Sequence, residues 1–347
     1  SLKSSTAGES THIDGIAKTP GSSAEITQAT LNDLKNPFPT ISDVYSYEAN
    51  GSEEAKKDVV AGSISVDAKG SAEVLYGNMG EGKIDTQGDF TVSGKDSVYV
   101  DSDLHIGGDL NLNSDGEIVL DLSNMGNIGK DNLHNSFLDH FKNDGTEGKG
   151  TIKVGGVENA VNADNFMIAI DMWDYQNNEF ALDKYDRGDD DTLAGDIDKL
   201  KINIGGNDKV TARDHTFIWV DGAEQLNGIQ AYKDENADSQ ILSYNFALKG
   251  DVDASQLTNY NPIGSGTTTV TGDDGKVTEI ENKFTGTFDG RGFRIIGLDV
   301  NQGGKDDNGN TVVKKHDDAG VFGTVGEGGT VKDLGIYSSH ITGEDTA

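Results

Sequence analysis

The sequence predicts an all-β fold built as a solenoid, with short helical insertions. Three observations lead to this prediction: the composition, an internal repeat and a glycine-rich stretch. The chain of 347 residues has 46 glycines and 4 prolines. A chain that is rich in Gly, poor in Pro and scattered with β-branched residues is typical of many short strands joined by turns.

The internal repeat compares "GDFTVSGKDSVYVD" (88–101) with "GDLNLNSDGEIVLD" (108–121). The offset is 20 residues without a gap, so that Phe90 matches Leu110 and Val98 matches Ile118. A hairpin meander or a sandwich also gives short strands at regular spacing. A constant offset favours the coil of a solenoid, because one coil buries little alone and stacked coils continue one core.

The glycine-rich stretch is "ENKFTGTFDGRGFRIIGLDV" (281–300). A phosphate-binding loop would need G-x-x-x-x-G-K-[ST] and a helix after it. A dinucleotide fingerprint would need G-x-G-x-x-G. Neither is present, and "FRIIGLDV" has the pattern of a strand. We therefore expect Gly286, Gly290, Gly292 and Gly297 to form the corners of β-coils, where they permit positive φ and close approach of the backbone.

Other segments are predicted from their periodicity. Short helices are expected at 24–34, 132–144 and 220–232, the last with Asp221 as its cap and Glu224 in the capping pattern. Strands are expected at 165–173, 199–204 and 215–220, and 183–198 is expected to be an acidic loop.

Charge narrows the possible partners. The chain has 60 acidic and 28 basic residues, a net charge of −32. Such a chain repels phosphate backbones and anionic lipid surfaces, so we expect no nucleic-acid binding. No apolar run reaches the roughly 18 residues of a membrane span, so no membrane insertion is expected. The absence of cysteine is typical of a bacterial extracellular protein.

A family resemblance rests on "FTGTFDGRGFRIIGL" followed by "AGVFGTVGEGGTVKDLGI". These segments resemble the GLUG-motif repeats of bacterial surface adhesins. "FIWVDGAEQLNGIQAY" and "YNFALKGDVDAS" look like the segment that introduces such repeats. The repeat at 88–121 is similar to coils of filamentous-haemagglutinin-like exoproteins, which use two-partner secretion. The resemblance implies a right-handed parallel β-helix.

On this basis the chain divides into four parts. We expect a polar N-terminal segment at 1–60, coils with the 20-residue repeat at 61–125, an irregular β-helix section at 126–214 and GLUG-type coils at 215–347. The resemblance implies a secreted or cell-surface adhesin or structural filament, not an enzyme. Its expected partners are a host or bacterial cell-surface protein or glycan, and an outer-membrane secretion partner.

The acidic loop holds the candidate binding residues. "DRGDDDTLAGDID" places Asp186, Asp189, Asp190 and Asp191 close together, with Asp196 and Asp198 following. Clustered carboxylates suit calcium, although the order does not match an EF-hand. The alternative is a solvated acidic loop. Arg187, Gly188 and Asp189 also spell an integrin-type tripeptide, which is the candidate receptor-binding site.

Enzymatic alternatives each require particular residues. A zinc peptidase needs H-E-x-x-H, and none of the seven histidines has a Glu beside it. A carbohydrate-active β-helix enzyme would need carboxylates in a groove, and the best cluster is Asp171, Trp173, Asp174 and Tyr175. The alternative for that cluster is a strand end with an exposed rim, and Arg291 and Arg294 are expected to be structural. An acidic, calcium-binding matrix or surface-layer protein is the third possibility.

Overall fold

The structure is a computed structural model. It describes residues 2–3, 11–13, 59–76, 83–123, 136–142, 150–181, 193–231, 240–257, 260–271, 275–300, 302–305, 311–313 and 320–341. The chain divides into two compact units. Unit 1 comprises residues 1–171 and 183–216, and unit 2 comprises residues 172–182 and 217–347.

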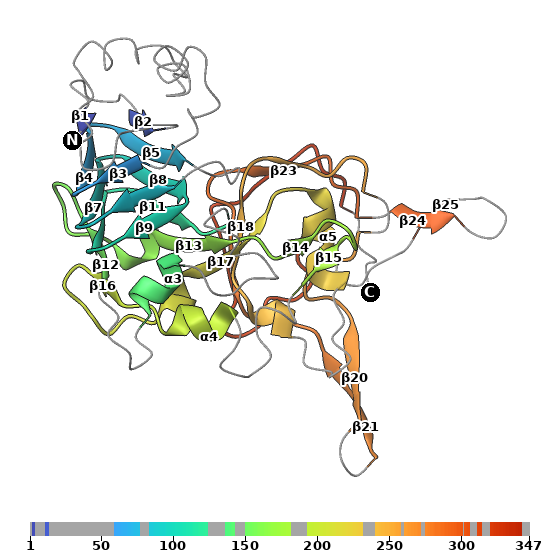
Figure 1. Ribbon diagram of the computed structural model, residues 1–347. Helices are drawn as coiled ribbons and strands as arrows, with labels where there is room; N and C mark the ends of the chain where they lie inside the picture. The colour runs from blue at the N-terminus through green and yellow to red at the C-terminus, as the bar shows by residue number, and fades with distance from the viewer. Residues whose placement is uncertain are drawn as a thin grey trace. The chain divides into compact units, whose positions relative to one another are not determined.

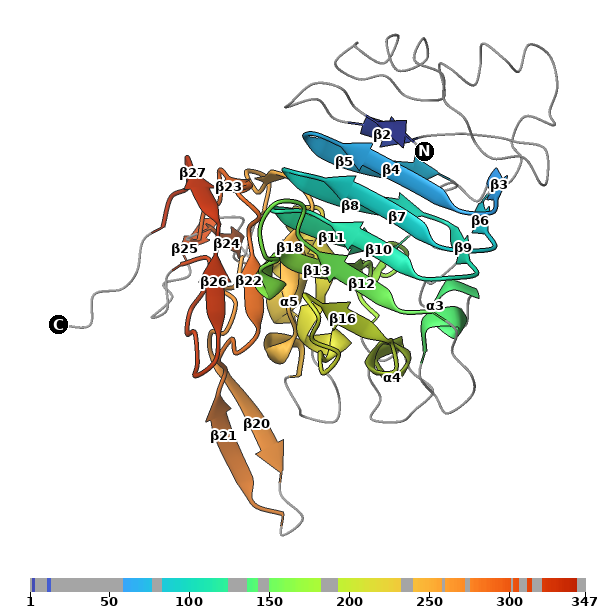
Figure 2. The same ribbon diagram turned by 90° about the vertical axis from the view of Figure 1, so that its left-hand side faces the viewer.

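Unit 1 is built from stacked parallel strands. Its sheets run in the orders β1-β4-β7-β10-β12-β16, β2-β5-β8-β11-β13 and β3-β6-β9. Neighbours in these orders are several elements apart in the sequence and pair in parallel. Figure 2 shows β4, β7, β10, β12 and β16 as successive levels of one stack. This arrangement confirms the predicted parallel β-helix.

The strands of unit 1 are β1 (Leu2–Lys3), β2 (Thr11–Ile13), β3 (Val59–Ala61), β4 (Ile64–Ala68), β5 (Ser71–Tyr76), β6 (Ile84–Thr86), β7 (Phe90–Gly94), β8 (Ser97–Ser102), β9 (Leu104–Ile106), β10 (Leu110–Asn113), β11 (Glu117–Asp121), β12 (Ile152–Gly155), β13 (Phe166–Ile170) and β16 (Ile202–Ile204). Figure 1 follows them from blue to green-yellow.

The 20-residue repeat is confirmed in the strand register. Leu110 pairs with Phe90, and Ile118 pairs with Val98. The inward positions of β7 and β10 are buried, whereas the outward ones are half-buried and polar. On the outer face, Asn111 Nδ2 donates to Thr91 Oγ1 at 3.2 Å. Each coil therefore continues the core and the outer ladder of the coil before it.

Two short helices stand where the first strand of a coil stands in earlier coils. Helix α3 (Ser136–Phe141) precedes β12, and helix α4 (Leu193–Asp198) precedes β16. Helix α3 packs against β9 and buries Phe137, Leu138 and Phe141, which confirms this part of the helix predicted at 132–144. Helices of this length are not stable alone, so the buried face holds them.

Unit 2 repeats the parallel stacking. Its sheets run in the orders β17-β18-β22-β26 and β19-β23-β27, with three antiparallel hairpins among the described residues. Its strands are β14 (Trp173–Asp174), β15 (Glu179–Phe180), β17 (Thr216–Val220), β18 (Phe246–Leu248), β19 (Val252–Asp253), β20 (Thr267–Thr271), β21 (Val277–Glu281), β22 (Thr287–Asp289), β23 (Arg294–Ile296), β24 (Gln302–Lys305), β25 (Thr311–Val313), β26 (Thr330–Lys332) and β27 (Gly335–Tyr337).

The remaining helices among the described residues are α5 (Ala223–Ala231) and the 3-10 turns η2 (Ala163–Asn165), η4 (Ala212–His215) and η5 (Gln240–Ser243). Helix α5 lies within the predicted helix at 220–232. At the start of α5, the Asp221 amide donates a hydrogen bond to Gln225 Oε1 at 2.5 Å. The predicted Glu224 is therefore not the residue that makes this contact.

The glycines of the stretch at 281–300 lie at corners and close approaches, as the sequence predicts. Gly292 and Gly297 have φ values of 78° and 72°. A Cβ on Gly286 would lie 2.0 Å from the Tyr244 carbonyl oxygen, and one on Gly290 would lie 2.5 Å from the Asp333 carbonyl oxygen. Strand β23 follows, not a helix, which excludes the phosphate-loop geometry for this stretch.

Candidate functional site

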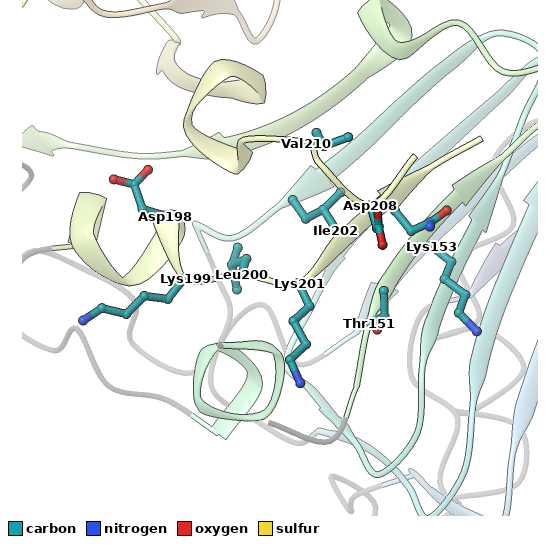
Figure 3. A pocket seen from close by; sticks show the side chains of 10 residues that line it. Thr151, Lys153, Asp198, Lys199, Leu200, Lys201, Ile202, Asp208 and Val210 are labelled. Carbon is teal, nitrogen blue, oxygen red and sulfur yellow. The ribbon is translucent and has the colours of Figure 1, made fainter. Parts of the chain in front are cut away.

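A groove of about 460 Å³ opens in unit 1 beside strands β12 and β16. Figure 3 shows the side chains that line it. The lining residues are Thr151, Lys153, Asp198, Lys199, Leu200, Lys201, Ile202, Asn203, Asp208 and Val210. They come from two consecutive coils, so the coil register sets their positions.

The register places the polar groups of the groove side by side. Strand β12 pairs with β16 so that Lys153 lies beside Asn203. After β16, Gly205 and Gly206 adopt φ values of 59° and 92° and turn the chain back. The turn is closed by a bond from the Asn207 amide to the Ile204 carbonyl at 2.9 Å. Only residues that tolerate positive φ make this turn without strain.

The floor of the groove is apolar and its rim is charged. Leu200 and Ile202 are buried, and Val210 is half-buried. In Figure 3, Val210 and Ile202 lie next to each other, and Lys201 and Lys153 extend toward the same side with Thr151 between them. A floor of this kind with a few polar groups above it is the general form of a small-molecule site.

Ion pairs hold two sides of the rim. Lys153 Nζ lies 2.5 Å from Asp109 Oδ2. The hydrogen bond and charge of Asp109 raise the pKa of Lys153. Burial pushes the pKa of Asp109 upward, but hydrogen bonds from Lys153 and from the Thr151 amide outweigh it, and the net pKa is lowered. On the other side, Arg213 binds Asp198 at 2.6 Å and fixes the end of α4.

The groove can hold a ligand with one anionic group. Lys153, which pairs with Asp109, and Lys201 supply positive charge on one side of the groove, whereas Lys199 extends toward the opposite side (Figure 3). Asp208 and Asn203 supply oxygen and amide groups of the kind that bind hydroxyls. Asp208 is exposed and makes no hydrogen bond or ion pair with another described residue.

The residues predicted for calcium and receptor binding lie outside the described residues. These are Asp186, Arg187, Gly188, Asp189, Asp190 and Asp191. The prediction of an acidic loop is wrong for its end, because residues Leu193–Asp198 form helix α4. In this helix Asp196 is buried and lies 3.3 Å from Lys142, and Asp198 is paired with Arg213. Among the described residues, no three His, Cys, Asp or Glu side chains are grouped to hold a metal ion.

Two members of the predicted aromatic and carboxylate cluster, Trp173 and Asp174, make structural contacts. Trp173 is buried, with its ring centroid 4.9 Å from that of Phe180. Asp174 accepts the Gln176 amide at 2.9 Å within the hairpin turn. Tyr175 is exposed. Trp173 thus faces the core and offers no ring for stacking on a sugar.

The two arginines of the glycine-rich stretch are structural too, as predicted. The guanidinium of Arg291 lies 5.0 Å from the ring centroid of the buried Trp219. Arg294 binds Asp251 at 2.6 Å and also donates its amide to that carboxylate at 2.8 Å. The hydrogen bonds from Arg294 lower the pKa of Asp251. Both arginines connect neighbouring coils.

The groove lysines are functional candidates that sequence reasoning missed. The segment "KLKINI" (199–204) alternates polar and apolar residues, and this pattern predicted the strand but not the groove. The signal that could have identified the groove is the 50-residue offset between the register partners Ile152 and Ile202, which places Lys153 beside this strand. Insertions between the coils hide that offset.

In comparisons with protein families, curated proteins and solved structures, nothing matches this chain. The resemblance to GLUG-repeat and filamentous-haemagglutinin-like adhesins therefore stays a prediction. In the parts of the chain that the structure describes, no helix is long and apolar enough to span a membrane.

Proposed function

We propose that this chain is a non-catalytic segment of a secreted or surface-displayed bacterial adhesin. In this proposal, stacked coils extend the molecule, and a groove on the coils binds a cell-surface glycan. The observation that supports it best is the groove beside β12 and β16, with its apolar floor and lysine rim. Sites built on strands keep their geometry better than sites on loops.

The chemistry of the lining favours an acidic saccharide as the ligand. A carboxylate or sulfate suits the ammonium group of Lys201 and that of Lys153, which also pairs with Asp109. The apolar CH face of a sugar ring suits Ile202 and Val210, and ring hydroxyls suit Asn203 and Asp208. About 460 Å³ is within the usual range for a small ligand.

The total charge limits the ligand further. A chain with a net charge of −32 repels a polyanion at long range. A single acidic sugar at the end of a glycan carries little charge, so it meets less of this repulsion. We therefore propose a glycan with one acidic residue, not a highly sulfated polymer.

The test compares binding of the protein to 3′-sialyllactose and to neutral lactose, with attachment of glycan-bearing cells as a second readout. We expect binding to the acidic sugar, no binding to lactose, and weaker binding at higher salt. The double variant Lys199→Glu/Lys201→Glu should weaken binding by about tenfold or more.

The matched control is Lys276→Glu together with Lys249→Glu, which changes the net charge equally but lies in unit 2, outside the groove lining. This control should bind like the unchanged protein. Equal loss in both variants, or no binding to any acidic sugar, would reject the groove as the site. Cleavage of the bound sugar would instead favour a carbohydrate-active enzyme.

A further inference from the structure

One main-chain position of the sheet in unit 1 bonds the following strand in each coil until β16. Leu110, Ile152 and Ile202 are successive register partners in β10, β12 and β16. The Leu110 amide donates to the Thr151 carbonyl at 3.1 Å, and the Ile152 amide donates to the Lys201 carbonyl at 2.8 Å. Ile202 holds the same position in β16, which stands last in this sheet order among the described strands.

The amide and the carbonyl of Ile202 therefore point away from β12. In a parallel pair, alternate residues of a strand bond the same neighbour. On the β12 side, the bonds of this strand come from the Lys201 carbonyl and from the Gly205 amide, which lies 2.9 Å from the Val154 carbonyl oxygen. The amide and carbonyl of Ile202, between them, make no hydrogen bond with another residue that the structure describes. They form an open donor and acceptor at the edge of the sheet.

This edge opens into the groove. Ile204 and Asn207 exchange two main-chain bonds of 2.9 Å, which places the returning chain on this side of β16. After Asn207 the chain leaves the strand, and Asp208 and Val210 line the groove together with Ile202. Figure 3 shows Val210 next to Ile202. The open main-chain groups thus lie at the wall of the groove, beside an apolar side chain.

The open edge is too short to favour an added peptide strand. On one side, the main chain of Ile204 is occupied by the turn, and on the other, Leu200 forms an antiparallel bridge with Lys142. A peptide strand gains its affinity from a row of main-chain bonds. A single open residue suits instead a small group that brings one donor and one acceptor.

We propose that the acidic sugar bound in the groove carries an acylated amino group, and that the main chain of Ile202 recognises it. This inference rests on the proposed function. The Ile202 carbonyl accepts the N–H of the acylamino group, and the Ile202 amide donates to the neighbouring hydroxyl, since a trans amide directs its own C=O away from its N–H. The acyl methyl packs against Val210, and the acidic group lies toward Lys201.

The test compares binding of 3′-sialyllactose with binding of its analogue in which a hydroxyl replaces the acetamido group. Both sugars carry the same carboxylate. We expect the analogue to bind about tenfold more weakly, because it loses the methyl contact and the amide donor. Equal binding of the two sugars would overturn this inference and leave the acidic-glycan proposal intact. Binding of neither sugar would reject both.

A matched pair of variants tests the apolar contact. Val210→Thr replaces one methyl by a hydroxyl and keeps the shape, so it should weaken binding of 3′-sialyllactose about threefold and change binding of the analogue less. Val157→Thr makes the same change at an exposed valine of unit 1 outside the groove lining, and should change neither. Equal weakening of both sugars by Val210→Thr would contradict the methyl contact.

Hydrogen exchange measured by NMR tests the open edge in the unchanged protein. In the free protein, the Ile202 amide should exchange faster than the Ile152 amide, which is bonded to Lys201. Saturating 3′-sialyllactose should slow exchange of the Ile202 amide about tenfold or more. An Ile202 amide as protected as that of Ile152 before sugar is added, or unchanged by bound sugar, would show that Ile202 is not the recognising residue.

Discussion

Gly290 shows how a single residue limits the spacing of the coils. The Cβ of any other residue would lie 2.5 Å from the Asp333 carbonyl oxygen and 2.5 Å from Leu334 Cα. Both atoms belong to the backbone of the next coil, so the contact is relieved only by moving that coil. Gly292 differs, since its φ is 78° and a Cβ there would meet no atom within 4 Å.

We therefore expect Gly290→Ala to lower the free energy of unfolding by about 2–4 kcal/mol, through overpacking between coils. Gly292→Ala should cost about 1–2 kcal/mol, because only the left-handed backbone is strained. Gly222→Ala, which has open space and no positive φ, is the control and should change little. Denaturant unfolding measures all three. Equal costs for Gly290→Ala and Gly222→Ala would contradict the close approach.

Residue patterns were predictable from the sequence where the period was short. The offset of 20 residues identified Phe90 and Leu110 as register partners without any structure. The groove was not predictable, because Lys153 and Asn203 become neighbours only after insertions of unequal length. The roles of Arg291 and Arg294 followed from their place in a turn and a strand.

At the scale of elements, aspartates connect the corner of one coil to the next. Asp89 Oδ1 accepts the Asp109 amide at 2.9 Å, and Asp109 Oδ1 accepts the Thr151 amide at 2.9 Å. These contacts lie just before β7, β10 and β12. They satisfy the amides just before β10 and β12, and Asp109 adds the ion pair with Lys153.

The lowered pKa of Asp109 predicts how the stability of the fold changes with pH. The pKa of Asp109 is lowered in the folded state, so its contribution is present above the ordinary carboxyl pKa of about 3.9 and is lost as the pH falls through the lower, folded value. Asp109→Asn should lower the free energy of unfolding by about 1 kcal/mol at pH 7, a modest value because Lys153 is half exposed to solvent. The cost should shrink below about pH 4.

The control for this variant is Asp85→Asn, whose carboxylate is more exposed than that of Asp109 and lies 3.4 Å from Lys83. Surface pairs of this kind contribute little, so we expect a change below about 0.5 kcal/mol at pH 7. Urea unfolding at several pH values measures both variants. A cost for Asp109→Asn that does not change with pH would show that the charge of Asp109 has no part in stability.

Element types were predictable where a face was clearly apolar. Leu226 and Ile229 are both buried on α5, as the periodicity of 220–232 predicts. The sequence could not show that α3 and α4 replace strands at the start of a coil. For α3, this position depends on packing against β9, which no local sequence pattern reveals. The contact of Gln225 at the start of α5 was likewise hidden behind the stronger signal of Glu224.

At the scale of the whole molecule, everything depends on parallel stacking along the outer ladder of unit 1. Ser65, Thr91, Asn111, Lys153 and Asn203 are successive register partners in β4, β7, β10, β12 and β16. Adjacent strands lie about 4.8 Å apart. The groove uses the last two positions of this ladder, so its existence depends on the same register.

The most direct test is a pair of distances between spin labels, in a chain that has no cysteine of its own. Labels at Thr91→Cys and Asn203→Cys are three rungs apart, and labels at Ser65→Cys and Asn203→Cys are four rungs apart. Pulsed electron paramagnetic resonance should give backbone separations of about 14 Å and about 19 Å. Distances that do not increase by about one rung would contradict the stacked parallel β-helix.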